Sequence, residues 1–213
     1  MITNPSGLER KYKGVIVSLT RRMKNNWQMF ASYVYSKAEG NVDNVSFSSQ
    51  GGGNAGPSGF LDTPNSLVNA YGPLTNDNTH QVKLQGTYAI PKWNLSLSGN
   101  YTFLTGNTFT RRVNCFVLRE TDTRCFNGFE QTLGRYYGEQ RGSQRLPNRN
   151  EIDLRAEWGP KIAGGKIGII LDVFNVTNQG RATAVETRDG GNFGNATEFN
   201  APRQYRLGFR YTF

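Results

Sequence analysis

The chain has 213 residues, a formal net charge of +9 and a hydrophobic fraction of 36%, with a mean hydropathy of −0.59. It contains no run of about 20 consecutive apolar residues, which excludes a helical membrane protein. Its 25 glycines, its 12% aromatic residues and its abundant Asn, Ser and Thr favour an all-β protein, in which many strands are joined by turns and loops.

Two hairpins are predicted in the first half of the chain. Apolar residues alternate with mainly polar or small ones over residues 11–22 and again over 27–36, with Ile16, Phe30 and Val34 as exceptions and a short polar link between the two stretches. The same alternation covers residues 80–90 and 93–103, and Pro91 and Lys92 predict a tight turn between these two strands. Trp93 is expected to open the fourth strand.

Three more strands are predicted in the second half, over residues 151–158, 167–174 and 205–213. Long segments rich in Gly, Asn, Ser and Pro separate the predicted hairpins, at about residues 38–78, 104–148 and 178–202. Short and long connections therefore alternate along a chain of about seven strands. Outer-membrane barrels have this arrangement, with short periplasmic turns and long extracellular loops.

The last predicted strand has one wholly apolar face and one polar or small face. The apolar face is lined by Tyr205, Leu207, Phe209, Tyr211 and Phe213. This ending resembles the C-terminal signal of bacterial outer-membrane barrels, a strand of alternating hydrophobic residues closed by Phe. The resemblance implies that the barrel-assembly machinery recognises the strand.

Three stretches together resemble the C-terminal barrel portion of TonB-dependent outer-membrane receptors, in particular the Oar-like group that carries a carboxypeptidase-regulatory-like domain. They are residues 12–38, with Tyr-Lys-Gly-Val and Ala-Ser-Tyr-Val-Tyr-Ser-Lys-Ala; residues 171–178, Leu-Asp-Val-Phe-Asn-Val-Thr-Asn; and residues 206–213. The resemblance implies an antiparallel up-and-down transmembrane β-barrel of roughly 22 strands with a plugged lumen. Residues 1–213 would form the C-terminal part of that barrel domain.

The same resemblance implies a receptor that imports a ligand, with a plug domain and a TonB-contacting box that this sequence does not contain. We expect outer-membrane lipid and lipopolysaccharide as partners and a C-terminus in the periplasm of a Gram-negative cell. Residues 1–7 have neither the basic start nor the apolar segment of a secretory signal. We therefore expect the chain to be a piece of a longer precursor.

The only cysteines, Cys115 and Cys125, both lie in the second long loop. If that loop faces an oxidising compartment, we expect a structural disulfide between them, worth about 2 to 3 kcal/mol. A two-cysteine metal site would need further ligands, and the only histidine lies elsewhere, at position 80. We expect no metal, no cofactor and no enzymatic activity.

The second loop is also rich in arginine and aromatic residues. We predict that it captures a ligand, anionic or with a flat ring, on a surface that includes Arg111, Arg112, Arg119, Arg124, Phe126, Tyr136 and Tyr137. The alternatives are adhesion to lipopolysaccharide phosphates and plain solvation. No nucleic-acid motif accompanies the positive charge, so nucleic acid is not expected as a partner.

A separate set of charged residues is predicted to face the lumen. It consists of Asp153, Arg155, Glu157, Asp172, Arg206 and Arg210. Because opposite charges are interleaved, we expect them to pair across adjacent strands and hold a plug or a water network. A carboxylate pair for glycoside chemistry, Asp153 with Glu157, is the less favoured interpretation.

Two other classes of protein remain open at this point. One is a complete small outer-membrane barrel with an adhesive or structural role. The other is a soluble all-β ligand-binding domain, in which the aromatic stripes would form a core rather than contact lipid.

Overall fold

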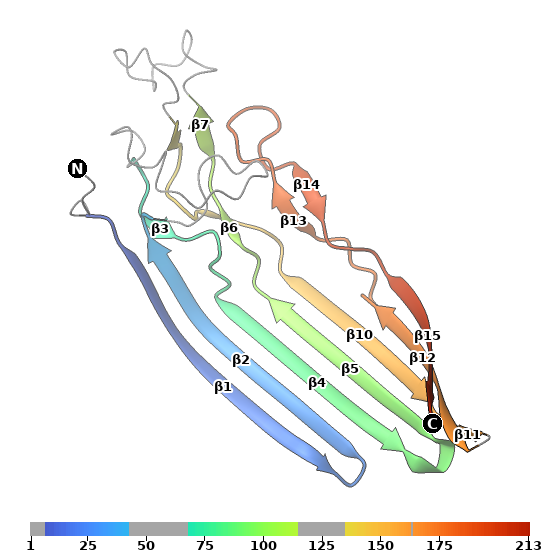
Figure 1. The fold of residues 1–213 in the computed structure, drawn as a ribbon. Coiled ribbons are helices and arrows are strands. Elements are labelled where there is room, and N and C mark those ends of the chain that lie inside the picture. Colours follow the sequence, from blue (N-terminus) through green and yellow to red (C-terminus); the bar gives the residue numbers. More distant parts are fainter. Residues whose placement is uncertain (1–6, 43–67, 115–134, 163) are drawn as a thin grey trace, which may run out of the picture.

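The structure is a computed structural model, and it describes residues 7–42, 68–114, 135–162 and 164–213. Seven long strands lie within these residues and run antiparallel in one wide sheet (Figure 1). They are β1 (Arg10–Lys24), β2 (Trp27–Gly40), β4 (His80–Ile90), β5 (Leu95–Leu104), β10 (Arg149–Trp158), β12 (Gly165–Phe174) and β15 (Gln204–Thr212). The all-β prediction and the count of about seven strands are confirmed.

The long strands are hydrogen-bonded in the order β1-β2-β4-β5-β10-β12-β15, so each one pairs with its long neighbours in sequence. This is the up-and-down order that the hairpin pattern predicts. The two outermost, β1 and β15, pair with a long strand on one side only within the described chain.

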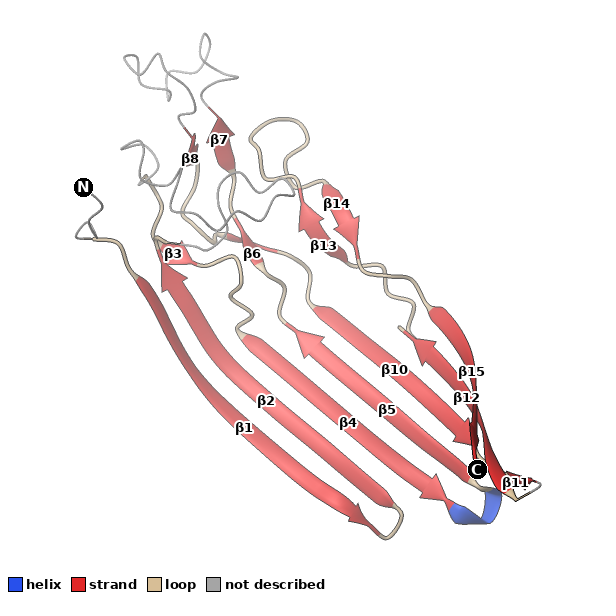
Figure 2. Ribbon diagram, viewed as in Figure 1, coloured by secondary structure: helices blue, strands red, loops and turns tan. Residues whose placement is uncertain are grey.

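Tight turns join the strands at one end of the sheet. Asn25 and Asn26, with φ of 55° and 67°, connect β1 to β2. Asn tolerates the left-handed backbone that a two-residue hairpin turn of this kind requires. Between β4 and β5 the chain forms the short helix η2 (Pro91–Trp93), drawn in blue in Figure 2. The prediction that Trp93 opens a strand is therefore wrong, because Pro91 starts a helical turn that ends at Asn94.

In the described part of the chain, eight short strands lie outside the long ones, all but β11 toward the opposite end of the sheet (Figure 1). They are β3 (Gly72–Pro73), β6 (Thr108–Phe109), β7 (Arg112–Asn114), β8 (Arg135–Tyr137), β9 (Gln144–Arg145), β11 (Lys161–Ile162), β13 (Ala182–Val185) and β14 (Ala196–Phe199). All but β11, which follows the turn after β10, lie in the segments that the sequence predicts as loops. These pieces are too short for an alternation pattern to reveal them. Among the described residues, no helix is long and apolar enough to cross a membrane.

The register places the predicted apolar positions on one face of the sheet. Row by row, Leu19 pairs with Ala31, Ala31 with Leu84, and Leu84 with Tyr101. Directly paired residues point to the same side of a sheet, so this face is apolar from β1 to β15. It is also exposed: Phe209 leaves 73% of its surface accessible and Leu19 leaves 59%. A sheet that exposes this much apolar surface needs an apolar surrounding.

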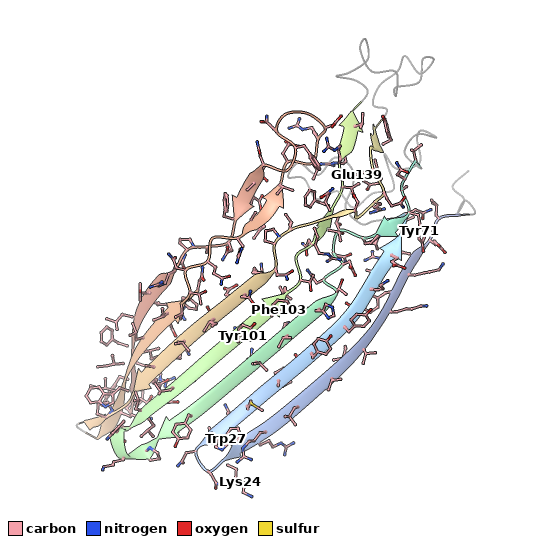
Figure 3. All side chains as sticks on the ribbon, turned by 180° about the vertical axis from the view of Figure 1, so that it is seen from behind. Lys24, Trp27, Tyr71, Tyr101, Phe103 and Glu139 are labelled. Atoms are coloured by element: carbon pink, nitrogen blue, oxygen red, sulfur yellow. The ribbon has the colours of Figure 1, made fainter. Side chains whose placement is uncertain are left out.

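Buried side chains lie mainly beyond the loop end of the sheet. We call residues 68–79, 105–114, 135–148 and 176–203 the loop layer. It contains Leu74 and Val113, which are fully buried, and Ala70, which packs with Tyr137. Figure 3 shows Tyr71 and Glu139 in this layer, far from Trp27 and Lys24 at the turn end.

Candidate functional site on the polar face and in the loop layer

A row of polar residues crosses the second face of the sheet at one level. It runs from Gln28 on β2 through Thr87, Ser98 and Arg155 to Asp172 and Arg206 on β15, and each residue is paired with the next. Strand alternation places all of them opposite the apolar face. On this face the sheet can therefore offer hydrogen-bonding side chains at one level from β2 to β15.

Asp172 is the centre of an ion network in this row. Its Oδ1 accepts a hydrogen bond from Arg155 Nε at 2.6 Å, and its Oδ2 lies 2.8 Å from an Arg206 Nη atom. The carboxylate side chain is only 6% exposed, although both arginines remain half exposed. Charge-assisted hydrogen bonds of this geometry fix β10, β12 and β15 relative to one another.

The other predicted lumen-facing charges have separate partners. Arg210 on β15 pairs with Glu157 on β10, across the intervening strand β12. Asp153 accepts hydrogen bonds from the Asn175 backbone amide at 2.9 Å and from Asn100 Nδ2 at 3.4 Å. The six charges thus form three neighbouring groups rather than one network. Asp153 and Glu157, the two carboxylates considered for glycoside chemistry, therefore already have hydrogen-bond or ion-pair partners.

An open hollow of about 630 Å³ lies against the polar face. Among its lining residues are Gln28, Gln85, Asn100, Asp153, Arg155 and Asp172. Amides and ion-paired side chains offer both donors and acceptors, with no strong excess of either charge. Such a surface suits a hydrated or polar ligand, or a polar protein surface.

The loop layer is held by a second ion pair, between Asp77 and Arg145. Arg145 donates to the Asp77 carboxylate at 2.9 Å and also to the backbone oxygens of Asp77 and Gly106, both at 2.7 Å. The same carboxylate accepts hydrogen bonds from the Ala38 amide and the Thr79 hydroxyl, each at 3.0 Å. This pair, whose Asp77 side chain is only 5% exposed, joins the connection between β2 and β4 to the connection between β5 and β10.

Arg111 and Arg112, predicted to capture a ligand, contact the third loop instead. Arg111 donates to Asp189 at 2.8 Å and lies over the Phe193 ring, 3.9 Å from its centroid. Arg112 donates through Nε to the Thr187 hydroxyl at 2.8 Å, and its backbone bridges to the same segment. Both guanidinium groups therefore join the second and third loops.

Two further residues predicted for ligand capture are buried. Tyr136 is 9% exposed and Tyr137 is 7% exposed, so neither ring is free on the surface. Arg141, another arginine of the second loop, is only 2% exposed and has its guanidinium 5.4 Å from the Tyr137 ring centroid. Aromatic and arginine residues in this loop pack against each other, because the layer has few aliphatic side chains for a core.

The remaining predictions for this loop lie outside the described residues. They are the disulfide between Cys115 and Cys125 and the ligand-capture residues Arg119, Arg124 and Phe126. The residues that the sequence suggests as an assembly signal lie on or directly after the last strand. Tyr205, Leu207 and Tyr211 face the apolar side with 55–66% exposure, and Phe213 follows the strand end.

Two carboxyl groups of the loop layer have lowered pKa values. A hydrogen-bonded ion pair with Arg188, strengthened by the Arg188 backbone amide, lowers the pKa of Glu186 to about 2. Burial raises the pKa of the Glu139 carboxyl, but hydrogen bonds from the Arg111 amide and from Gln144 outweigh it, and the net direction is downward. Both groups are therefore anionic acceptors: Glu139 connects two parts of the second loop through the Arg111 amide, and Glu186 fixes the local turn to Arg188.

Asn175 belongs to the 171–178 stretch quoted above, but sequence reasoning gave it no structural role. It is 2% exposed, has φ of 47°, and its side-chain amide donates to the Gln179 and Ala201 carbonyl oxygens at 3.1 and 2.8 Å. The pairing of Asp77 with Arg145 was also missed, because the two lie 68 residues apart. The available signal for Asn175 was its place at a strand end, where Asn tolerates the left-handed backbone.

The fold, the exposed apolar face and the polar face together define an outer-membrane barrel wall. A sequence model described as "Outer membrane beta barrel domain" matches residues 2–114, which is more than half of the chain. The chain belongs to this family of outer-membrane β-barrel domains. A comparison with curated protein sequences found no match.

Three solved structures are similar to the chain in fold. BauA, the ferric preacinetobactin receptor from Acinetobacter baumannii, matches with a TM-score of 0.61 and 15% identity, over 98% of this chain and 23% of that one. The outer membrane transporter YddB from Escherichia coli gives 0.57 and 14%, over 95% and 25%. The ferripyoverdine receptor of Pseudomonas aeruginosa gives 0.56 and 14%, over 99% and 21%. The chain spans about a quarter of the length of these neighbours.

Proposed function

We propose that this chain is part of the wall of a TonB-dependent outer-membrane receptor that binds a ligand and imports it across the outer membrane. The observation that carries the proposal is the seven-strand sheet with one continuous apolar face and one continuous polar face. The similar solved structures are described as a ferric preacinetobactin receptor, a transporter and a ferripyoverdine receptor, which supports the receptor class. Ferric siderophores are therefore the first ligands to test.

The open edges of the sheet support a barrel larger than this chain. β1 and β15 each pair with a long strand on one side only in the described residues, and unpaired strand edges are not stable in lipid. Further strands would close the sheet, as the resemblance to a roughly 22-stranded barrel implies. A complete small barrel made of these strands alone is less consistent with an open and only gently curved sheet (Figure 1).

The topology supports an orientation. The short turns after β1, β4 and β10 lie at one end of the sheet and the loop layer lies at the other. Outer-membrane barrels have short periplasmic turns and long extracellular loops. We therefore place the turn end and the C-terminus in the periplasm, and the loop layer outside the cell, where lipopolysaccharide would surround it.

Each part of the chain then has a role in import. The polar face, with the groups around Asp172, Asp153 and Glu157, would line the lumen and contact a plug or ordered water. The loop layer would contact the ligand first, on a scaffold fixed by Asp77 and Arg145. The plug and the TonB-contacting segment would come from other parts of the receptor, and the barrel-assembly machinery would recognise the last strand. The transport itself needs no covalent chemistry from these residues.

The test is ligand uptake by cells that express or lack the full-length protein. Radiolabelled ferric siderophores would be offered with the proton gradient intact and after its collapse by an uncoupler. The proposal predicts uptake that needs both the protein and the gradient. Outer-membrane localisation without energised uptake of any ligand would favour an adhesive or structural barrel, and recovery of the protein as a soluble monomer would favour a soluble binding domain.

A further inference from the structure

Two glycines lie opposite each other in the middle of the apolar face. Gly86 on β4 is paired with Gly99 on β5, and their outer partners in the same row are Met29 on β2 and Leu154 on β10. In this row the two central strands carry no side chain, whereas the neighbouring rows carry Leu84 with Tyr101 and Tyr88 with Leu97. The apolar face therefore has a gap at its centre.

Neither glycine is required by the backbone or by crowding. Neither has a positive φ. A Cβ atom added at Gly86 would meet nothing closer than the Gln28 carbonyl oxygen at 3.7 Å, and one at Gly99 would lie in ordinary contact with Leu154 Cδ2 at 3.4 Å. Glycine weakens the interior of a strand, so its presence at two paired positions that could hold larger residues points to a use for the space.

The gap forms an apolar hollow of about 520 Å³ on the outer surface. Its side-chain walls are Trp27, Met29, Tyr88, Leu97 and Leu154. Tyr88, Leu97 and Leu154 remain 42–52% exposed, so the hollow opens outward. A flexible hydrocarbon chain lying here would contact protein on its sides as well as its base, and would gain more dispersion contacts than on a flat face.

A cation stands beside this hollow, on the side of the tight turns. The guanidinium of Arg21 lies over the Trp27 ring, 3.9 Å from its centroid, and Arg21 is the strand partner of Met29. Its Nη2 donates a long hydrogen bond to the Lys24 carbonyl oxygen at 3.4 Å, and its Nε is buried without a hydrogen-bond partner within the described residues. Trp and Arg are both favoured at the level of lipid head groups. The indole ring has both an apolar and a polar part, and the guanidinium can bind a phosphate.

We propose that this hollow is a binding site for one phospholipid molecule of the inner leaflet. One acyl chain lies over Gly86 and Gly99, and the head-group phosphate is bound by Arg21 beside Trp27. The choice of phospholipid rests on the proposed orientation, because Trp27 directly follows the turn residues that we place at the periplasmic surface. In this proposal the apolar face lies against the outer-membrane hydrocarbon, and the Arg21 guanidinium, with Lys24 paired to Trp27 beside it, is complementary in charge to a phosphate.

The test uses the full-length protein reconstituted in vesicles of phosphatidylethanolamine and phosphatidylglycerol that carry a trace of phospholipid with a photoreactive acyl chain. Cross-linked peptides would be mapped by mass spectrometry. The site predicts cross-links concentrated on β2, β4 and β5 around the glycine pair. Gly86→Leu fills the hollow and should lower this cross-linking at least several-fold, whereas Ala31→Leu adds the same side chain to the same face outside the hollow and should leave it unchanged.

A second variant keeps the test valid if Gly86→Leu does not fold. Arg21→Gln leaves the hollow intact and should lower retention of phospholipid after detergent extraction, measured by native mass spectrometry. Four results would each overturn the proposal. They are cross-links spread evenly over the apolar face, a cross-link pattern unchanged in Gly86→Leu, preferential labelling by a photoreactive lipopolysaccharide, and a second protein copy bound over the hollow. Because uptake is measured separately, loss of the lipid site with uptake intact would leave the proposed receptor function standing.

Discussion

The sheet and the loop layer are stabilised in different ways. In the sheet the large apolar side chains point outward and remain exposed, so the backbone ladder and the surrounding lipid determine its stability. In the loop layer Leu74, Val113 and Tyr137 are buried, and Asp77 with Arg145 joins the segments through hydrogen bonds. The chain thus contains a sheet with one face suited to hydrocarbon, and a loop layer stabilised by its own buried residues and ion pairs.

The largest expected effect comes from placing a charge on the apolar face of the wall. Leu84→Arg puts a cation near the middle of β4, and we expect a loss of about 2 to 4 kcal/mol in the unfolding free energy in lipid. Gln85→Arg puts the same residue on the polar face and should cost less than about 1 kcal/mol. Denaturant unfolding of both variants in vesicles measures the difference. Equal losses would mean that the two faces do not have different surroundings.

The next effect is confined to the loop layer. Asp77→Ala removes the acceptor of the Ala38 amide and leaves Arg145 without its carboxylate, which should lower the local free energy of opening by about 2 to 3 kcal/mol. Hydrogen exchange should accelerate in residues 70–79 and 139–146 while β4 and β5 stay protected. If the sheet loses protection to the same extent, the loop layer is not a separate body.

A smaller effect is expected for the ion network of the polar face. Asp172→Ala leaves Arg155 and Arg206 without their shared acceptor, and since both arginines are about half exposed, we expect a loss of only about 1 to 2 kcal/mol. Asp172→Asn keeps one acceptor oxygen and should lose less. The unfolding free energy in lipid distinguishes the two variants. A neutral result for Asp172→Ala would show that the network does not stabilise the wall.

The smallest effect is a pH dependence of the third loop. The folded pKa of Glu186 is lowered from 4.5 to about 2, so its contribution is complete above about pH 4.5 and is lost as the pH falls toward 2. For an exposed pair we expect roughly 0.5 kcal/mol. Amide hydrogen exchange of β13 and β14, measured at several pH values and corrected for intrinsic exchange rates, should show this loss of stability. Glu186→Gln should remove the dependence, and a dependence that persists in this variant would assign it to another group.

The sequence predicted the wall well because a strand has a period of two. Val15, Leu84 and Phe209 follow that period, and the register places all of them on the apolar face. The alternation failed at Trp93, where Pro91 begins a helical turn. It also could not detect β6 and β9, which are two residues long.

The loop layer was much harder to predict, for a physical reason. Its contacts join residues distant in sequence, such as Arg111 with Asp189, and no local pattern encodes them. The arginines and tyrosines of the second loop were therefore interpreted as a ligand surface, although Tyr136 and Tyr137 are buried and Arg111 and Arg112 bind the third loop. Composition gives the residue types in such a layer but not which of them face solvent.

The most direct test of the central claim is the environment of alternate residues along β4 in the full-length protein. Single cysteines would replace residues 82 to 85 and 87 to 88 in a background with Cys115→Ser and Cys125→Ser, and would carry a spin label. We expect high collision rates with oxygen at positions 82, 84 and 88, and with a water-soluble nickel chelate at 83, 85 and 87. Equal access of the chelate to both sets would contradict a membrane-spanning wall and would place the aromatic face in water or in a soluble core.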